Sequence, residues 1–409
     1  MTNNLAFSIS KSILLEPTLL LSPTLRDLAM YSSYYQEHDI FIKSIKKFCE
    51  TELSPHLEQW EAEGFFPNEV FRKLGEQGFL GILIPEEYGG IGGDYKLAAA
   101  WCEAWGELCD VGLTVAINMH SLVIGHSVAK FGTDKVKNEW LPKVVSGEAI
   151  GAYAFTEPGA GSDLANLTTK AEKKGDKWVI NGAKTFITNG ARADFILVLT
   201  RTDPTAGYNG FTTFLVDTKT PGFSVSKKLD KLGWRSSDTA ELSLENVEVD
   251  ETCILGKLGE GWTQSSNNLN WERAMLTLTS LGGARACFRE TAKYAGERKA
   301  FGKPLSELEL IDSWLQEMYC RILEGEAICH HAIDLMSEGL DCRAEVSAAK
   351  RKVCEDAVWI ADKAIQIHGG YGYTKEFNPE KWWRDLRLMP IGGGTSEIMG
   401  NIVAKHIGL

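Results

Sequence analysis

The sequence predicts an α+β protein in which a helical region is followed by a β domain and then by a helical bundle. Hydrophobic residues recur at spacings of three and four in the first and last thirds of the chain, whereas β-rich segments lie between them. The length of 409 residues suits two or three domains. We place a loosely ordered leader at residues 1–34, an α-helical domain at 35–150, a β domain at 151–261 and a four-helix bundle at 262–409.

The composition is that of an ordinary globular protein and excludes several classes. Hydrophobic residues make up 44% and charged residues 24%, which rules out a disordered or fibrous chain. A net charge of −12 without a basic block argues against a nucleic-acid partner. The nine cysteines form no CxxC pair, which favours a reduced protein over a disulfide framework or a zinc ribbon. The histidines do not cluster at ligand spacings, so we expect no metal site.

The N-terminal segment carries weak targeting signals. Its apolar run is broken by Glu16 and Pro17, and no apolar stretch in the chain is expected to approach the length of about 20 residues that spans a bilayer. The basic residues of the first 34 are Lys11 and Arg26, which makes a poor signal peptide and a weak transit peptide. We therefore expect an unstructured leader and prefer a cytoplasmic location, with the mitochondrial matrix as the alternative for a eukaryotic source.

Helical spacing marks the first region. Ile42, Ile45 and Phe48 lie three residues apart, which predicts an amphipathic helix with one buried face. The run from Asn68 to Gly78 predicts another helix, closed by a glycine of the kind that ends many helices.

The central region is predicted to form an antiparallel β domain. Lys177–Ile180 and Lys184–Ile187 are β-rich and flank Asn181-Gly182, which predicts a two-residue hairpin turn. Asn209-Gly210 predicts another turn. Further strands are predicted at residues 195–199, 211–216 and 241–245.

The last region is predicted to be a bundle of long helices. An apolar stripe with steps of three and four residues extends over about six helical turns, as a helix buried in a bundle requires. Its members are Val346, Ala349, Val353, Ala357, Ile360, Ala364 and Ile367.

Five segments have the composition of ligand-binding elements, although the common nucleotide, hydrolase and zinc-protease signatures are absent. Glycine-rich turns let backbone N–H groups approach a ligand, and an arginine beside Gly-Lys-Pro suits a pyrophosphate. Each segment also has a plain structural alternative: a linking turn, an ordinary strand, a solvated basic loop, a helix C-cap and a helix N-cap, in chain order. The segments are residues 156–163, 186–188, 297–304, 366–373 and 392–397.

In combination these segments resemble the acyl-CoA dehydrogenase family of flavoproteins. TEPGAGSD, NGAKTFITNG, ERKAFGKP, QIHGGYGY, WWRD and GGGTSEI occur in the order and spacing of that family over about residues 35–409. The resemblance implies an N-terminal helical domain, a central β-barrel-like domain and a C-terminal four-helix bundle. It also implies FAD between the β domain and the bundle, an acyl-CoA substrate, electron-transfer flavoprotein as the electron acceptor, and a homotetramer.

The resemblance assigns the cofactor contacts to five parts of the chain. Residues 153–162 and 186–188 would contact the isoalloxazine, with Thr188 close to flavin N5. Arg298 and the turn at 366–370 would reach the FAD of a neighbouring subunit, and residues 395–397 would hold the adenosine half. The candidates are Tyr153, Phe155, Thr156, Gly161, Ser162, Phe186, Ile187, Thr188, Arg298, Phe301, Gln366, Gly369, Gly370, Thr395 and Glu397. Phe186, His368 and Glu309 depart from the common family pattern.

The usual catalytic glutamate of the family is missing. The residues that match its YEGT sequence are Gly392-Gly393-Gly394-Thr395, and a glycine cannot remove a proton. A minority of the family, including isovaleryl-CoA and long-chain acyl-CoA dehydrogenases, carries the glutamate in an ER motif on the first bundle helix. Trp271-Glu272-Arg273 occupies that register here, so Glu272 is the candidate base. The alternative is a glutamate that only favours the helix dipole.

The resemblance then implies a mechanism. The Gly393 N–H and a flavin ribityl hydroxyl would hold the thioester carbonyl, Glu272 would remove the α-proton, and the β-hydride would move to flavin N5. The product would be a trans-2-enoyl-CoA. Burial should raise the pKa of Glu272 toward the working pH. The candidate substrate contacts are Ser162, Asn270, Arg273, Gly392 and Gly394.

The acyl group is less well defined by the sequence. The IGGGTSE run and the segment 227–233 are similar to those of isovaleryl-CoA dehydrogenases, which favours a short branched acyl-CoA. Space left by Gly392 and Gly393 could equally serve a longer or cyclic chain. Two further alternatives stay open: an acyl-CoA oxidase or flavin monooxygenase relative, and a flavoprotein that binds acyl-CoA without turnover.

Overall fold

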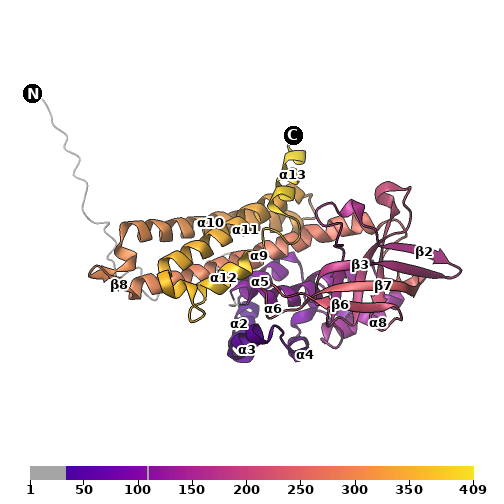
Figure 1. Ribbon diagram of the computed structural model, residues 1–409, viewed down its shortest axis with the longest axis horizontal. Helices are drawn as coiled ribbons and strands as arrows, with labels where there is room; N and C mark the ends of the chain where they lie inside the picture. The colour runs from indigo at the N-terminus through magenta and orange to yellow at the C-terminus, as the bar shows by residue number, and fades with distance from the viewer. Residues whose placement is uncertain (1–33, 108–109) are drawn as a thin grey trace, which may run out of the picture.

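The computed structural model describes residues 34–107 and 110–409, so all but the last residue of the expected leader at 1–34 lies outside the described residues. The chain forms a helical part, a β part and a second helical part in that order (Figure 1). In this view the long helices extend to the left, the strands lie to the right, and the first helices lie below the junction between them.

The first part is helical up to residue 145, as the hydrophobic spacing predicts. Ile42 and Ile45 are buried, and Gly78 takes the left-handed conformation after the predicted second helix. The helices are α2 (Asp39–Phe48), α3 (Leu57–Glu63), α4 (Glu69–Glu76), α5 (Tyr95–Gly106), α6 (Val111–Asn118), α7 (His126–Phe131) and α8 (Asp134–Val145).

One stretch of this part is more apolar than expected. Val111–Phe131 is continuously helical, because the π-helical segment η7 (Met119–Gly125) joins α6 to α7, and it is long and apolar enough to cross a membrane. The expectation that no apolar stretch reaches such a length is therefore wrong. Since 94% of its most apolar window is buried inside the fold, these side chains pack against the rest of the chain.

The β part is a seven-stranded sheet in the order β1-β4-β2-β3-β7-β6, with β5 paired to β4. Most pairs are antiparallel, as predicted, but β1 runs parallel to β4, and β2 also meets β4 in a parallel register. The strands are β1 (Gly151–Ala154), β2 (Lys170–Lys174), β3 (Lys177–Thr188), β4 (Phe195–Arg201), β5 (Phe211–Asp217), β6 (Phe223–Lys228) and β7 (Thr239–Asp250).

The predicted hairpin at Asn181-Gly182 is wrong. Strand β3 continues through both residues, with an irregularity in its pairing to β7 between Ile180 and Gly182. A Cβ at Gly182 would lie 2.3 Å from Thr169 Oγ1, so the glycine permits a close backbone approach rather than a turn. The hairpin turn lies instead at Gly175, between β2 and β3.

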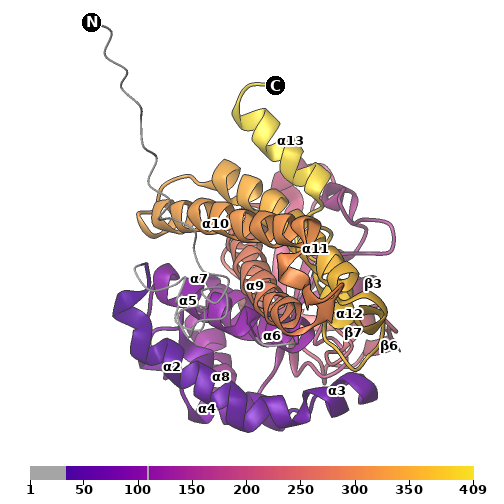
Figure 2. The same ribbon diagram turned by 90° about the vertical axis from the view of Figure 1, so that its left-hand side faces the viewer.

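The last part contains three long helices with two shorter ones beside them. All seven residues of the predicted apolar stripe are buried. Figure 2 shows α13 projecting from the body of the molecule toward the C-terminus. The helices are α9 (Gly261–Glu297), α10 (Glu309–Ser337), α11 (Arg343–His368), α12 (Pro379–Leu386) and α13 (Ser396–His406); β8 (Lys299–Ala300) and β9 (Lys303–Pro304) form a short hairpin after α9.

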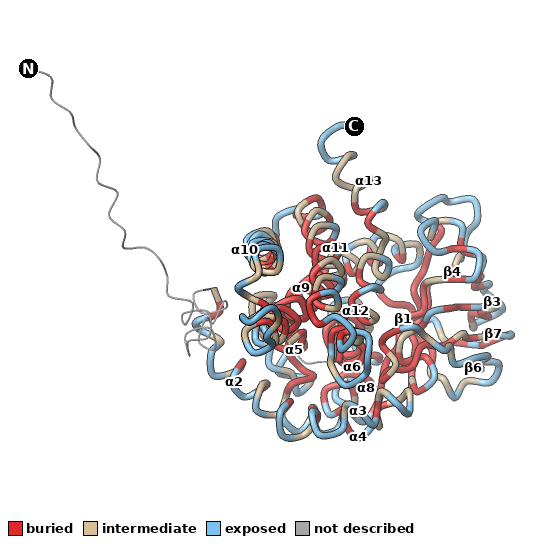
Figure 3. Tube along the Cα trace, turned by 60° about the vertical axis from the view of Figure 1, so that its left-hand side comes forward, coloured by how far each residue is buried: buried red, intermediate tan, exposed pale blue. Residues whose placement is uncertain are grey.

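The two helical parts share one hydrophobic core. Helices α5 and α9 cross closely because Gly106 and Gly282 have no side chains: a Cβ at either position would lie 2.4 Å from a carbonyl oxygen of the other helix. Figure 3 shows buried segments of α9 and of β1 in the interior of the molecule. The first turns of α9 are thereby held beside the β domain, which positions the candidate site.

Candidate active site

Glu272 lies on the fourth turn of α9 and is 9% exposed. Among the described residues, its carboxylate accepts no hydrogen bond and forms no ion pair. Burial therefore raises the pKa of Glu272 to about 7, although the positive charges of Arg273 and Lys350 act in the opposite direction. A buried carboxyl with a pKa near neutrality is suited to accept a proton during catalysis.

The backbone of α9 at this point is fixed by the preceding tryptophan. The Trp271 Nε1 donates a hydrogen bond of 3.0 Å to the Leu122 carbonyl in η7. The ring of Tyr95 packs against Trp271 with 4.9 Å between ring centroids. The apolar segment Val111–Phe131 of the first domain thus fixes α9 beside the base.

A loop of three glycines lies against Glu272. Arg273 Nε donates to the Gly393 carbonyl at 3.0 Å, and Lys350 Nζ donates to the carbonyls of Gly394 at 2.7 Å and Met389 at 3.1 Å. Within the described part of the chain, the Gly393 N–H donates no hydrogen bond. Two cations therefore hold the carbonyls of this loop, and the Gly393 N–H stays available for a ligand.

Gly393 and Glu272 are neighbours in space. Gly393 has a φ of 67°, and a Cβ added to it would lie 3.6 Å from Glu272 Oε1 and 2.8 Å from Leu276 Cδ1. Position 393, which has no side chain, is thus next to the Glu272 carboxyl from α9. The space predicted beside Gly393 is filled by these groups, whereas the nearest atom to a Cβ at Gly392 is 3.8 Å away.

The TEPGAGSD loop is braced by a buried ion pair. Lys184 Nζ lies 2.9 Å from Glu157 Oε1 and also donates to the carbonyls of Phe155 and Leu199. Glu157 accepts further hydrogen bonds from the backbone N–H groups of Thr168 and Thr169. These partners outweigh burial and hold the pKa of Glu157 at about 2. These bonds fix the buried side of the loop, whereas Gly159 and Gly161 lie on its open side.

The outer surface of this loop and of β3 fits a flavin. Phe186 is 67% exposed at a φ of 59°, an uncommon conformation for an aromatic residue that places its ring on the surface. Nothing lies within 4 Å of a Cβ at Gly159 or Gly161, so the loop backbone is open to a ligand. Behind it, the rings of Tyr153 and Phe155 are 3.9 Å apart. Aromatic faces, open backbone and the nearby hydroxyls of Thr156, Ser162 and Thr188 match the needs of a planar, polar-edged cofactor such as FAD.

A second group of predicted cofactor residues lies far from Glu272. Arg298 follows the end of α9, and 26 residues at a rise of 1.5 Å place it roughly 40 Å along the helix from Glu272. Gly369 and Gly370 end α11 at the same end of the bundle, where Tyr294 stacks on His368 at 4.0 Å. His368, which departs from the common family pattern, therefore has its ring packed against Tyr294. The exposed residues of this bundle end are Arg298, Phe301, Gln366, Gly369 and Gly370, as well as Glu309 at the start of α10.

The remaining predicted residues have local roles. Thr395 is the N-cap of α13, which is the structural alternative considered for this segment, and Glu397 is exposed in the first turn of that helix. Ile187 is buried in β3. Asn270 donates to Cys342 Sγ at 3.4 Å, while its own Oδ1 is buried without a hydrogen bond.

Sequence reasoning missed the cation on α11. Lys350 is 1% exposed. A signal was present, because position 350 lies four residues after Val346 and three before Val353, on the buried face of the helix. A lysine on an apolar stripe indicates a buried partner, which here is the glycine loop.

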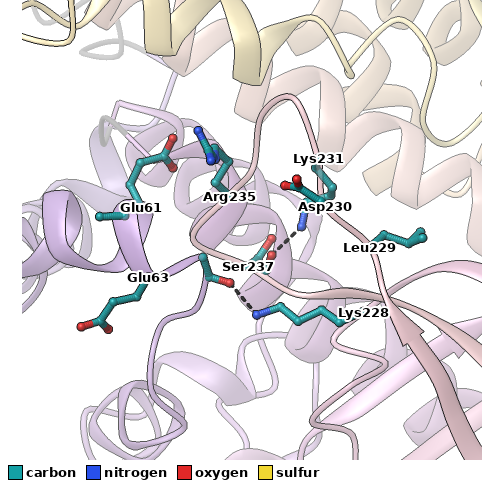
Figure 4. A pocket seen from close by; sticks show the side chains of 10 residues that line it. Glu61, Glu63, Lys228, Leu229, Asp230, Lys231, Arg235 and Ser237 are labelled. Carbon is teal, nitrogen blue, oxygen red and sulfur yellow. Dashed lines mark hydrogen bonds between the residues drawn. The ribbon is translucent and has the colours of Figure 1, made fainter.

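A separate cavity of about 280 Å³ lies between α3 and the segment after β6 (Figure 4). None of the predicted site residues lines it. Two of its cations are already engaged, since Lys228 donates to the Gly64 carbonyl and Lys231 to the Ser237 carbonyl. Within residues 34–107 and 110–409, no group of three potential metal ligands comes together.

Comparison with known proteins identifies the family. The N-terminal, middle and C-terminal domains of acyl-CoA dehydrogenase match residues 35–148, 152–247 and 259–408. The long-chain specific acyl-CoA dehydrogenase of Rattus norvegicus is 35% identical over 94% of this chain and 89% of its own length. The short/branched chain specific enzyme of the same organism is 35% identical over 96% and 91%.

The fold agrees with this match. The crystal structure of acyl-CoA dehydrogenase from Geobacillus kaustophilus superposes with a TM-score of 0.88 at 38% identity, covering 91% of this chain and 98% of that one. The buried carboxyl beside an open backbone donor and the flavin-compatible surface are what such an enzyme needs. The chain belongs to the acyl-CoA dehydrogenase family and is an FAD-dependent oxidoreductase that acts on the CH–CH bond of acyl-CoA.

Proposed function

We propose that this enzyme oxidises a short branched-chain acyl-CoA to the trans-2-enoyl-CoA, with Glu272 as the base that removes the α-proton. One observation carries the proposal: the Glu272 carboxyl is buried, has no partner among the described residues, and lies 3.6 Å from where a side chain at 393 would begin. The carboxyl from α9 thus takes the place of the family's usual glutamate in the loop.

The geometry of these residues supports the proposed proton transfer. The α-C–H bond breaks and its proton passes to the Glu272 carboxylate, while the Gly393 N–H donates to the thioester carbonyl and stabilises the developing enolate. Lys350 holds the Met389 carbonyl before that donor and the Gly394 carbonyl after it, and Arg273 holds the carbonyl of Gly393 itself. When held by the TEPGAGSD loop and β3, FAD would supply the acceptor for the β-hydride, and we propose electron-transfer flavoprotein as the partner that takes up the electrons.

The acyl group is proposed from the loop. A Cβ at Gly392 would meet no atom closer than 3.8 Å, so the loop leaves space on that side. A branched acyl chain would use this space, as the similarity of the IGGGTSE run to isovaleryl-CoA dehydrogenases also suggests. Long-chain and short/branched-chain relatives are equally similar in identity, so the long-chain acyl-CoA is the second candidate.

The oligomer is proposed from the position of Arg298. An arginine roughly 40 Å from Glu272 along one helix cannot serve the same flavin, so its role in FAD binding requires a second copy of the chain. We propose the homotetramer of the family on this basis. The mass of the enzyme in solution and the loss of FAD from Arg298→Ala test the oligomer.

We also propose a cytoplasmic location, which the weak transit-peptide signal of the N-terminal segment favours.

The experiment for the function is an anaerobic titration of the FAD-loaded enzyme with a panel of acyl-CoAs, followed by flavin bleaching. The panel holds isovaleryl-, isobutyryl-, butyryl-, octanoyl-, palmitoyl- and a cyclic acyl-CoA. We expect the branched members to bleach the flavin fastest. Fastest bleaching by palmitoyl-CoA would favour the long-chain acyl-CoA as the substrate. Spectral shifts without reduction by any member of the panel would favour the non-catalytic flavoprotein. Rapid reoxidation of the reduced enzyme by air would favour an oxidase.

A further inference from the structure

Lys350 is a buried cation that the proposed proton transfer does not itself use. It lies on α11, which is not the helix of the base, and it is 1% exposed. Its Nζ donates to the carbonyls of Gly394 at 2.7 Å and Met389 at 3.1 Å, the two ends of the loop that contains Gly393. Burying an ammonium group is unfavourable unless its donors are satisfied, and these two carbonyls offset part of that desolvation cost.

The same side chain is close to the base. A Cβ at Gly393 would lie 3.5 Å from Lys350 Cε and 3.6 Å from Glu272 Oε1, so the lysine and the carboxyl both border the same glycine. Within the described residues, Glu272 and Lys350 form no ion pair, and the Lys350 donors are directed to the loop carbonyls. The positive charge therefore acts on Glu272 across a short distance without capturing it.

We propose that Lys350 is a positioning residue of the reaction: it fixes the Gly393 loop through two carbonyls, and its charge favours the ionised form of Glu272. This inference rests on the proposed function of Glu272 as the base. Arg273 shares the task, because it holds the intervening Gly393 carbonyl from α9. The two cations together anchor Met389, Gly393 and Gly394, and so set the direction of the Gly393 N–H.

Lys350 is one of two positive charges near Glu272, and the other is Arg273. The titratable neighbours of Glu272 are Arg273 on its own helix, Lys350 on α11 and the Tyr153 phenol on β1, while the segment 389–394 contains no ionisable side chain. Burial raises the pKa of Glu272 to about 7, and Lys350 is one of the two charges that lower it. Burial also raises the pKa of Tyr153, which keeps the phenol neutral.

The test uses a 3-thia-acyl-CoA, whose β-sulfur has no hydride to lose, with the FAD-loaded enzyme in D2O. The rate of α-proton exchange, followed by NMR against pH, reports the base directly and does not depend on flavin reduction. The variants are Lys350→Met, which removes the charge and the donors, Lys350→Gln, which removes the charge but keeps donors, and Lys350→Arg, which keeps the charge. Lys352→Met is the matched control, because Lys352 lies on the same helix and pairs with Glu324 and Asp356 instead.

We expect the midpoint of the exchange profile to rise by about one pH unit or more in Lys350→Met and Lys350→Gln. The midpoint of the exchange profile in Lys350→Arg and in Lys352→Met should equal that of the wild type. The exchange rate at high pH should fall about 10- to 100-fold in Lys350→Met, because the loop loses two anchors. If Lys350→Met does not fold, Lys350→Gln carries the same prediction for the midpoint.

An unchanged midpoint in a folded neutral variant overturns the role of Lys350, as does an equal shift in Lys350→Arg. Wild-type enzyme that exchanges no α-proton, or Glu272→Gln that exchanges as fast as wild type, overturns the proposed base instead. The two failures are therefore distinguishable within one experiment.

Discussion

Two buried glutamates at the candidate site have opposite surroundings. Glu157, beneath the TEPGAGSD loop, has an ion pair with Lys184 and hydrogen bonds from Thr168 and Thr169, and its pKa is about 2. Glu272, on α9, has no hydrogen bond or ion pair among the described residues, and its pKa is about 7. The two carboxyls are of one chemical type and similarly buried, at 4% and 9% exposed.

The difference shows how burial alone does not determine reactivity. A buried carboxylate with a full set of donors is a permanent anion and stabilises structure, whereas one without partners can exchange a proton near neutral pH. Glu157 therefore holds the cofactor loop in place, and Glu272 is available for chemistry.

The largest effect is expected at the ion pair. Lys184→Met leaves the Glu157 carboxylate buried without its cation, which should lower the free energy of unfolding by about 3–5 kcal/mol. The measurement is denaturant unfolding of the wild type and the variant. Lys173→Met is the control, because Lys173 pairs with Glu251 on the surface and should cost less than about 1 kcal/mol. Equal effects of the two substitutions would show that burial of the pair does not matter.

The base should show the opposite behaviour in stability. Because the pKa of Glu272 rises from 4.5 to about 7 on folding, the folded state binds the proton more tightly, and stability is lost as pH rises from about 4.5 to about 7. Glu272→Gln removes this loss. We expect the variant to be more stable than the wild type by up to about 3 kcal/mol at pH 8, with no such gain at pH 4.

Thermal and denaturant unfolding at the two pH values check this expectation without substrate. Glu157 works in the other direction, since its lowered pKa contributes stability above pH 4.5 that is lost as pH falls toward 2. A Glu272→Gln variant that is less stable than the wild type at pH 8 would mean that the ionised carboxylate has a partner after all.

The smallest effect is expected in the glycine loop. Gly393→Ala must place a Cβ at a φ of 67° and 2.8 Å from Leu276 Cδ1, which should cost about 1–2 kcal/mol of stability and slow α-proton exchange about tenfold. Gly392→Ala is the matched control for stability, because its Cβ would have 3.8 Å of clearance and a φ outside the left-handed region. Equal stability of the two alanine variants would contradict the strain expected at Gly393, and wild-type exchange in Gly393→Ala would remove the role given to its backbone.

The order of the domains and most helices could be predicted from the sequence, because hydrophobic spacing reports directly which face is buried. The stripe on α11 is an example, since all seven of its residues are buried. The turn at Asn181-Gly182 could not, because the same dipeptide serves a bulge where Thr169 approaches the backbone. The parallel pairing of β1 with β4 also depends on contacts that are distant in sequence.

The site was predictable only in part for a related reason. The family motifs identify Glu272 and Gly393, but sequence spacing does not reveal that a Cβ at 393 would point toward Glu272 Oε1. The ion pair of Glu157 and Lys184 joins a loop residue to a residue of β3 that is 27 positions later. Lys350 joins α11 to a loop 44 positions later. Such partners are fixed by tertiary packing.

The most direct test of the account is kcat/KM of the wild type and Glu272→Gln over pH 5–9, with the acyl-CoA that bleaches the flavin fastest. We predict that the wild-type value falls as pH drops below about 7, where the base becomes protonated. Glu272→Gln should be slower by about 10²- to 10⁴-fold at pH 8 and should lose this pH dependence. A variant that retains wild-type turnover with the same pH profile would contradict the assignment of Glu272 as the base.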